Sequence, residues 1–166
     1  AGTKMHYDIE CFYNKCYNEN SSIEFDYFKR FYEDFKHLKP YRTEWMVYYE
    51  ELKLSGSIDM IFENPDGSLQ IYDWKRCKEI SYDSNFGKSA ITQCISHLPD
   101  TNYWHYSLQL NVYKNILELK YGKKVTDLYL VCLHPDSGYK TYDRIKVQIL
   151  DKEIKDLFEF RKTQLE

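Results

Sequence analysis

The chain has 166 residues, and 23 Lys and Arg against 26 Asp and Glu give a formal net charge of −3. This length predicts one domain over residues 1–166 whose core needs no disulfide or structural metal. The slight acidity excludes a protein that coats nucleic acid by bulk positive charge, but it allows a local basic rim around an acidic site. The longest purely apolar stretch, residues 128–133, is far shorter than the roughly 18 residues of a membrane-spanning helix, so no membrane partner is expected.

The five cysteines, at positions 11, 16, 77, 94 and 132, are scattered and form no C-x-x-C pair. This pattern supports neither a disulfide framework nor a tetrahedral zinc or iron–sulfur site. We therefore expect reduced thiols in an intracellular compartment, without distinguishing cytoplasm, nucleus and mitochondrion.

Two helices are predicted first. Apolar residues at positions 5, 9, 12 and 16 form one face of a helix that begins almost at the first residue, which is typical of a domain excised from a larger protein. A second helix is expected to be capped by Ser21 or Ser22, to include Leu38 in its apolar face and to be ended by Pro40.

Strands dominate the middle of the chain. Apolar and aromatic runs predict strands at residues 45–54, 56–63 and 68–74, and Asn64-Pro65-Asp66-Gly67 predicts the turn between the last two. A long connection over residues 76–102 is typical of a functional loop or insertion. A helix at 103–119, strands at 125–133 and 141–149 and a helix at 151–165 complete the order. The expected fold class is α/β, a mixed sheet flanked by helices.

Two carboxylates fall on the predicted hairpin. Asp59 and Asp73 lie on neighbouring strands joined by a tight turn, and strand alternation directs Asp73 and Lys75 to the same face. Two carboxylates that approach each other repel unless a divalent cation such as Mg²⁺ or Mn²⁺ lies between them. With Lys75 to hold the attacking water or the scissile phosphate, such a site can hydrolyse a phosphodiester. Alone, an Asp-x-Lys pattern is more often a solvated strand face.

Two pairs of residues add to this pattern, and the members of each pair are four positions apart. His6 and Glu10 share one face of the first helix, and Gln109 and Tyr113 share one face of the later helix. Each pair taken by itself is compatible with an ordinary surface or capping role.

Together these residues give four ordered motifs. The sequence reads G-x-x-x-H at residues 2–6, G-x-x-D at 56–59, D-x-K at 73–75 and Q-x-x-x-Y at 109–113. In this order the motifs resemble those of the RecB-type nucleases of the PD-(D/E)XK superfamily. The resemblance implies that superfamily's core fold, Lys75 as a catalytic residue with Asp73 and Asp59, and Gln109 and Tyr113 positioning DNA phosphate or ordering the site. It also implies metal ligation by the side chains of His6, Asp59 and Asp73 and by the Trp74 carbonyl.

The roles of two further acids and of a group of aromatic and basic residues remain open. Glu44 matches an acidic position upstream of the G-x-x-D motif and either binds a second metal through water or only begins a strand. Glu10 either orients the imidazole of His6 or lies at the surface. Near the long connection, a mixture of lysines and aromatic rings suits a single-strand channel as well as ordinary packing. This DNA-binding group is Lys78, Lys88, Tyr103, Trp104 and Tyr106.

The leading hypothesis is a metal-dependent DNA nuclease, an exonuclease acting in replication, recombination or repair. The expected cofactor is Mg²⁺ or Mn²⁺, without an iron–sulfur cluster, because the late trio of cysteines found in some relatives is missing. The expected partner is DNA, as single strands or duplex ends, with helicase, primase or polymerase domains fused in a parent protein. The alternatives are a catalytically silent module that binds nucleic acid through the same fold, and a metal-dependent RNA endonuclease.

Overall fold

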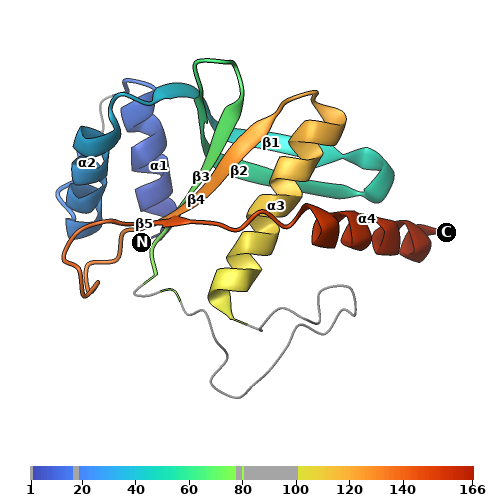
Figure 1. Ribbon diagram of the computed structural model, residues 1–166. Helices are drawn as coiled ribbons and strands as arrows, with labels where there is room; N and C mark the ends of the chain where they lie inside the picture. The colour runs from blue at the N-terminus through green and yellow to red at the C-terminus, as the bar shows by residue number, and fades with distance from the viewer. Residues whose placement is uncertain (1, 17–18, 78–79, 81–100) are drawn as a thin grey trace.

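The computed structural model describes residues 2–16, 19–77, 80 and 101–166 (Figure 1). They form a mixed α/β structure in which helices flank a five-stranded sheet. The elements are, in chain order, α1 (Gly2–Tyr13), α2 (Ile23–Phe35), β1 (Lys39–Tyr49), a short 3₁₀ helix η1 (Glu50–Leu52), β2 (Leu54–Glu63), β3 (Leu69–Lys75), α3 (Asn102–Lys120), β4 (Val125–Cys132), β5 (Asp143–Lys146) and α4 (Asp151–Leu165).

The strands follow one another across the sheet in the order β1-β2-β3-β4-β5. β1, β2 and β3 form an antiparallel meander, β3 and β4 pair in parallel, and β5 returns antiparallel to β4. A parallel pair needs a crossover connection, and α3 lies within it. Figure 1 shows α3 passing across the sheet, with α1 and α2 at the left.

Each face of the sheet has its own core. On one face the helices α1 and α2 pack an aromatic cluster that includes Phe28, Phe31 and Trp74. On the other face α3 and α4 cover a largely aliphatic cluster that includes Ile71 and Leu110. Because side chains alternate along β3, Trp74 points towards α1 and α2 whereas Asp73 and Lys75 point to the α3 side. This alternation agrees with the prediction from sequence.

The helix α2 begins as predicted but ends earlier. The Ser22 hydroxyl accepts a hydrogen bond from Phe25 N at 3.2 Å, which is an N-cap. The helix ends at Phe35, and Pro40 lies inside β1, where it is paired with Phe62. A proline is tolerated there because β1 is an edge strand whose outward N–H positions need no partner.

Strand bounds in the sheet also differ from those predicted. The predicted strand at 45–54 is the second half of β1 followed by η1 and the first residue of β2. The reversal is made by Lys53, which adopts the left-handed conformation with φ 53° and donates its N–H to Glu50 O. A lysine gives no turn signal of the Gly or Asn kind, so this reversal was not predicted. The last predicted strand, 141–149, is reduced to the four residues of β5.

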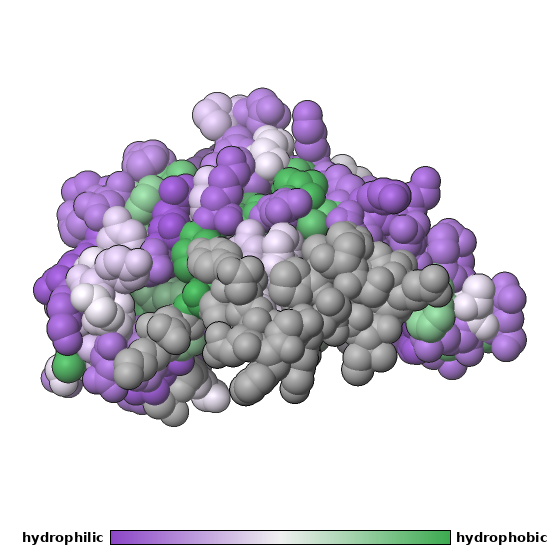
Figure 2. Space-filling model, turned by 60° about the horizontal axis from the view of Figure 1, so that its bottom comes forward, coloured by the Kyte–Doolittle hydropathy of each residue, from purple (hydrophilic) through white to green (hydrophobic). Residues whose placement is uncertain are grey.

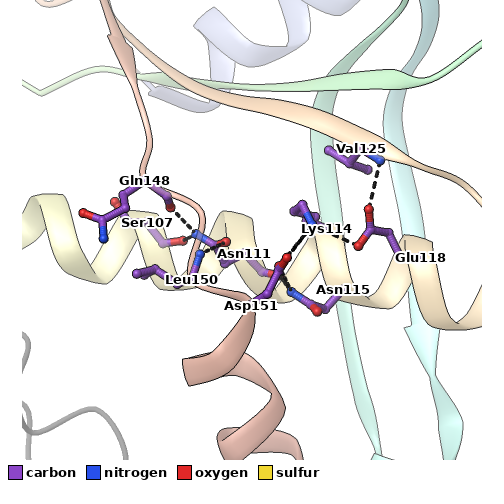
Figure 3. Close-up of polar contacts among 9 residues, drawn as sticks. All are labelled: Ser107, Asn111, Lys114, Asn115, Glu118, Val125, Gln148, Leu150 and Asp151. Atoms are coloured by element: carbon purple, nitrogen blue, oxygen red, sulfur yellow. Dashed lines mark hydrogen bonds and ion pairs between the residues drawn. The ribbon is translucent and has the colours of Figure 1, made fainter. Parts of the chain in front are cut away.

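A buried asparagine fixes α3 to the chain that enters α4 (Figure 3). The Asn111 side chain is fully buried and donates to Ser107 O at 2.8 Å and to Gln148 O at 2.9 Å. Its Oδ1 accepts from Leu150 N at 2.8 Å. One amide group thus bonds a carbonyl inside α3 and two backbone groups of the irregular chain that leads into α4.

A lysine on the same side of α3 extends this contact (Figure 3). Lys114 Nζ lies 2.9 Å from Glu118 Oε1 and 3.0 Å from Asp151 Oδ1. Glu118 also accepts a hydrogen bond from Val125 N at 3.1 Å, at the start of β4. These bonds restrain the rotation of α3 about its axis, so its opposite side presents a constant set of residues to the sheet.

None of the helices among the described residues is long and apolar enough to cross a membrane. In the view of Figure 2, hydrophilic side chains predominate on the described surface, and hydrophobic ones form small groups between them.

Candidate functional site

The candidate site lies where β2 and β3 separate. Their antiparallel register runs from Glu63 and Leu69 to Met60 and Tyr72, and the next pair in that register would be Asp59 and Asp73. There Asp59 Oδ2 accepts a hydrogen bond from Trp74 N at 2.9 Å. The Asp59 carboxylate thus takes the place of a backbone partner. Both acids lie at the point where β2 and β3 separate, beyond Met60 and Tyr72, which we call the fork.

His6 reaches this fork from α1. Its Nε2 lies 2.7 Å from the Trp74 carbonyl oxygen and 3.1 Å from Asp59 Oδ2. Both neighbouring atoms are hydrogen-bond acceptors, so Nε2 carries a proton, and this N–H is shared between the two oxygens. An imidazole nitrogen, a carboxylate oxygen and a carbonyl oxygen therefore lie together. That they bind a metal, as the resemblance implies, stays a prediction.

Asp73 is the buried acid of the pair. Its exposed fraction is 5%, and burial together with the negative charge of Asp59 raises its pKa to about 7. Asp73 Oδ2 lies 2.9 Å from Lys75 Nζ, but outside hydrogen-bond angles, and it has no hydrogen bond from any residue that the structure describes. Asp73 is therefore a buried carboxyl group that Lys75 neutralises by its charge.

Lys75 lies between the acid and an aromatic ring. Its Nζ is 4.3 Å from the centre of the Tyr106 ring, in addition to its ion pair with Asp73. Burial is the largest single effect and acts to lower the pKa of Lys75, but the neighbouring Asp73 and Asp59 together outweigh it, so the pKa lies above its usual value. Lys75 is thus a protonated ammonium group held on the α3 side of the fork.

Glu44 belongs to the same cluster. Thr43 pairs with Met60 and Trp45 with Ile58, so Glu44 lies opposite Asp59, within β1 rather than at its beginning. Its backbone is left-handed, with φ 43°, a strained conformation for a residue in a strand. Burial and the charge of Asp59 raise the pKa of Glu44, and Ser57 Oγ donates to its carboxylate at 3.0 Å.

Glu10 lies close enough to Glu44 for its negative charge to raise the pKa of Glu44 as well. Its predicted role, the orientation of His6, stays a prediction. Ser57 was not singled out from the sequence, because a serine inside a strand carries no separate signal.

Gln109 and Tyr113 approach the fork from α3. Gln109 Nε2 donates to the Tyr113 hydroxyl at 3.0 Å, so the two residues form a unit, as their spacing predicted. Burial raises the pKa of Tyr113, and the charges of Asp73 and Asp59 raise it further. The hydroxyl is therefore a neutral donor within electrostatic reach of both acids.

The predicted DNA-binding group is only partly brought together. Tyr106 lies beside Lys75, whereas Tyr103 is buried and its hydroxyl accepts from Gln148 N at 3.2 Å. Trp104 is half-buried and packs against Leu150. The ring of Tyr103 is therefore used for packing, one of the two alternatives that the sequence left open for this group. Lys78 and Lys88 lie outside the described residues.

The donor atoms at the fork suit a hard divalent cation. Carboxylate and carbonyl oxygens with one imidazole nitrogen are ligands that Mg²⁺ and Mn²⁺ accept, and the buried Asp73 oxygen, which accepts no hydrogen bond from the described residues, would gain from a second positive charge. Within the part of the chain that the structure describes, no three His, Cys, Asp or Glu side chains already form a ligating group. The reason is visible in the geometry: Asp59 and His6 contact each other, while Asp73 turns to Lys75.

Comparisons with known proteins add little. No family model matches the chain, and no curated protein matches its sequence. Among solved structures, it is similar to a Eubacterium rectale protein named "Putative exonuclease", at 10% identity over 94% of this chain and 70% of that chain, with a TM-score of 0.39.

Proposed function

We propose that the chain is a divalent-metal-dependent nuclease of the RecB type that hydrolyses phosphodiester bonds in DNA. The observation that carries this proposal is the fork between β2 and β3. There Asp59 lies beside Asp73 and contacts His6 and the Trp74 N–H, His6 also contacts the Trp74 carbonyl, and Lys75 pairs with Asp73. The order of the four sequence motifs agrees with it.

The cation would be held by His6 Nε2, the carboxylates of Asp59 and Asp73 and the carbonyl of Trp74. When bound, it supplies a water of lowered pKa and neutralises charge that develops on the phosphate. Because Nε2 now shares a proton with two oxygens, binding requires that this proton leaves His6. Asp73 likewise has to be ionised, which its ion pair with Lys75 favours.

Lys75 acts as an ammonium group and not as a general base. Its pKa is raised above the usual lysine value, so the neutral amine is scarce at pH 7. It can donate hydrogen bonds to the attacking water or to a phosphate oxygen, and the Tyr106 ring limits where Nζ can move. This assigns Lys75 to positioning and charge stabilisation.

Tyr113 is a candidate donor to the substrate. Its hydroxyl oxygen accepts from Gln109, so its own proton stays available for a phosphate oxygen. The raised pKa keeps that proton in place at neutral pH.

The test is degradation of 5′- and 3′-labelled DNA, single-stranded and duplex, and of a matched RNA, with Mg²⁺, Mn²⁺ or EDTA. We expect metal-dependent loss of DNA with the native chain and none with Asp73→Asn, which keeps the shape of the side chain but removes its charge. Asp156→Asn, an exposed acid on α4, is the matched control and keeps full activity.

Three results would contradict the proposal. Cleavage by Asp73→Asn at the native rate would show that the fork is not the site. Binding of DNA without cleavage under any metal would favour the silent binding module. Cleavage of RNA alone would favour the RNA endonuclease.

A further inference from the structure

Two cysteines outside the proposed cation site lie in contact beside it. Cys77 follows β3 by two residues, and Cys132 is the last residue of β4, paired with Lys75. Their Sγ atoms are 3.3 Å apart, and both thiols are free. The hydrogen bond from Leu133 N to Lys75 O, 2.9 Å long, continues the pairing of the two chains at this level and holds the thiols together.

The two thiols differ in access. Cys77 is half-buried, whereas Cys132 has an exposed fraction of 3%. A small oxidant can therefore reach Cys77 first, and Cys132 is placed behind it.

The two thiols also differ in acidity. The hydrogen bond with Cys132 lowers the pKa of Cys77, and the ammonium of Lys75 lowers it further. That same hydrogen bond and burial raise the pKa of Cys132. A more accessible and more acidic thiol next to a buried, less acidic one is the arrangement in which one cysteine is oxidised and the other resolves it.

We propose that Cys77 and Cys132 form a reversible oxidation site that takes hydroperoxides as its oxidant. The Cys77 thiolate attacks a peroxide oxygen, so that an S–O bond forms, the O–O bond breaks and the departing hydroxide takes up a proton to give water. The Cys132 sulfur then attacks Cys77 Sγ, so that an S–S bond forms and the S–O bond breaks. Its thiol proton and the hydroxide released leave as a second water.

The electron balance of the two steps closes. Two thiols lose two electrons in becoming one disulfide, and one hydrogen peroxide is reduced to two waters. A dithiol such as dithiothreitol reverses the reaction by thiol–disulfide exchange.

The contact does not indicate a soft metal site instead. Two thiolates alone do not complete a tetrahedral set, and the described part of the chain holds no third His, Cys, Asp or Glu in a ligating group with them. Asp143 is near enough for its charge to raise the pKa of Cys132, and that charge resists formation of a second thiolate.

The experiment uses the native chain, fully reduced and then treated with hydrogen peroxide at a few equivalents. Remaining thiols are alkylated, and chymotryptic peptides are mapped by mass spectrometry. We expect a peptide pair joined through Cys77 and Cys132, which dithiothreitol separates. The variant Cys77→Ser should lack this pair, and the control Cys16→Ser, at an exposed thiol, should retain it.

A second variant keeps the test decisive. In Cys132→Ala, the first step can occur but the second cannot, so dimedone should trap a sulfenic acid on Cys77. Failure to form the Cys77–Cys132 link in the native chain, or dimedone labelling of Cys16 without Cys77 in the variant, would overturn the proposal. These readouts do not depend on whether the chain cleaves nucleic acid.

Discussion

The ring of Tyr113 lies directly on the backbone of Gly56. A Cβ atom built on Gly56 would lie 2.2 Å from Tyr113 Cε1 and 2.9 Å from the Tyr113 hydroxyl oxygen. The first residue of the G-x-x-D motif and the last residue of the Q-x-x-x-Y motif are therefore one packing unit. The glycine is needed because α3 has to bring an aromatic ring against β2.

Replacement of Gly56 by alanine should disturb this unit. The methyl group and the ring cannot both keep their places, so we expect Gly56→Ala to lower the free energy of unfolding by about 1–3 kcal/mol in urea titrations. Gly138→Ala is the matched control, because a Cβ there meets no atom within 4 Å. In the background of Tyr113→Ala the cost of Gly56→Ala should largely vanish; equal costs in both backgrounds would show that the ring is not the obstacle.

Removal of Lys75 should separate chemistry from metal binding. Lys75→Ala deletes the ammonium but none of the donor atoms at the fork, so Mn²⁺ affinity measured by calorimetry at pH 8 should stay near that of the native chain. Cleavage should slow by roughly 100-fold or more, as for loss of other charge-stabilising donors. A variant that no longer binds Mn²⁺ would contradict the role given to Lys75.

The acidity of Asp73 predicts a pH-dependent stability in EDTA. The pKa of Asp73 is about 7 in the folded chain and 3.8 for an ordinary aspartate, so between these values the folded state holds a proton that the unfolded state has lost. The stability contributed by this group is present at pH 4 and is lost as the pH rises through 7. Urea titrations from pH 5 to 8 should therefore show a steeper decline for the native chain than for Asp73→Asn. Parallel curves for the two proteins would show that Asp73 titrates normally.

The junction between α3 and α4 depends on one amide. Asn111→Ala leaves Gln148 O and Leu150 N without their buried partner, and we expect a loss of about 2–4 kcal/mol in the free energy of unfolding. Asn115→Ala, at a half-buried position of the same helix, should cost less. An equal loss for both variants in urea titrations would indicate that Asn111 has no special role.

Periodicity and turn chemistry were sufficient for most of the fold. The alternation around Asp73 and Lys75 and the cap at Ser22 are local properties, and the structure confirms both. The predicted end of α2 was wrong because a proline can stop a helix but can also lie in an edge strand. Which of the two occurs depends on the position of β1 in the sheet, and this is not written in the local sequence.

The candidate site, like the fold, could be predicted only in part from the sequence. The spacing of the motifs predicted that Asp59 and Asp73 meet, and the fork between β2 and β3 brings them together. The left-handed backbone at Glu44 and the contact of Cys77 with Cys132 had no such signal. Both depend on strand register and on the point at which two strands separate, and register is a tertiary property. The packing of Tyr103, which the sequence left open, likewise depends on where α3 as a whole lies beside the chain entering α4.

The two cores on opposite faces of the sheet each contain an indole. Trp74 lies among the rings of α1 and α2, with Phe28 and Phe31 edge-on at 5.5 and 5.2 Å, whereas Trp45 lies in the cluster covered by α3 and α4. In a background with Trp104→Phe, replacement of either remaining tryptophan by phenylalanine leaves a fluorophore that reports on a single face. The chain thereby offers an internal optical measure of whether its two halves melt together or in sequence.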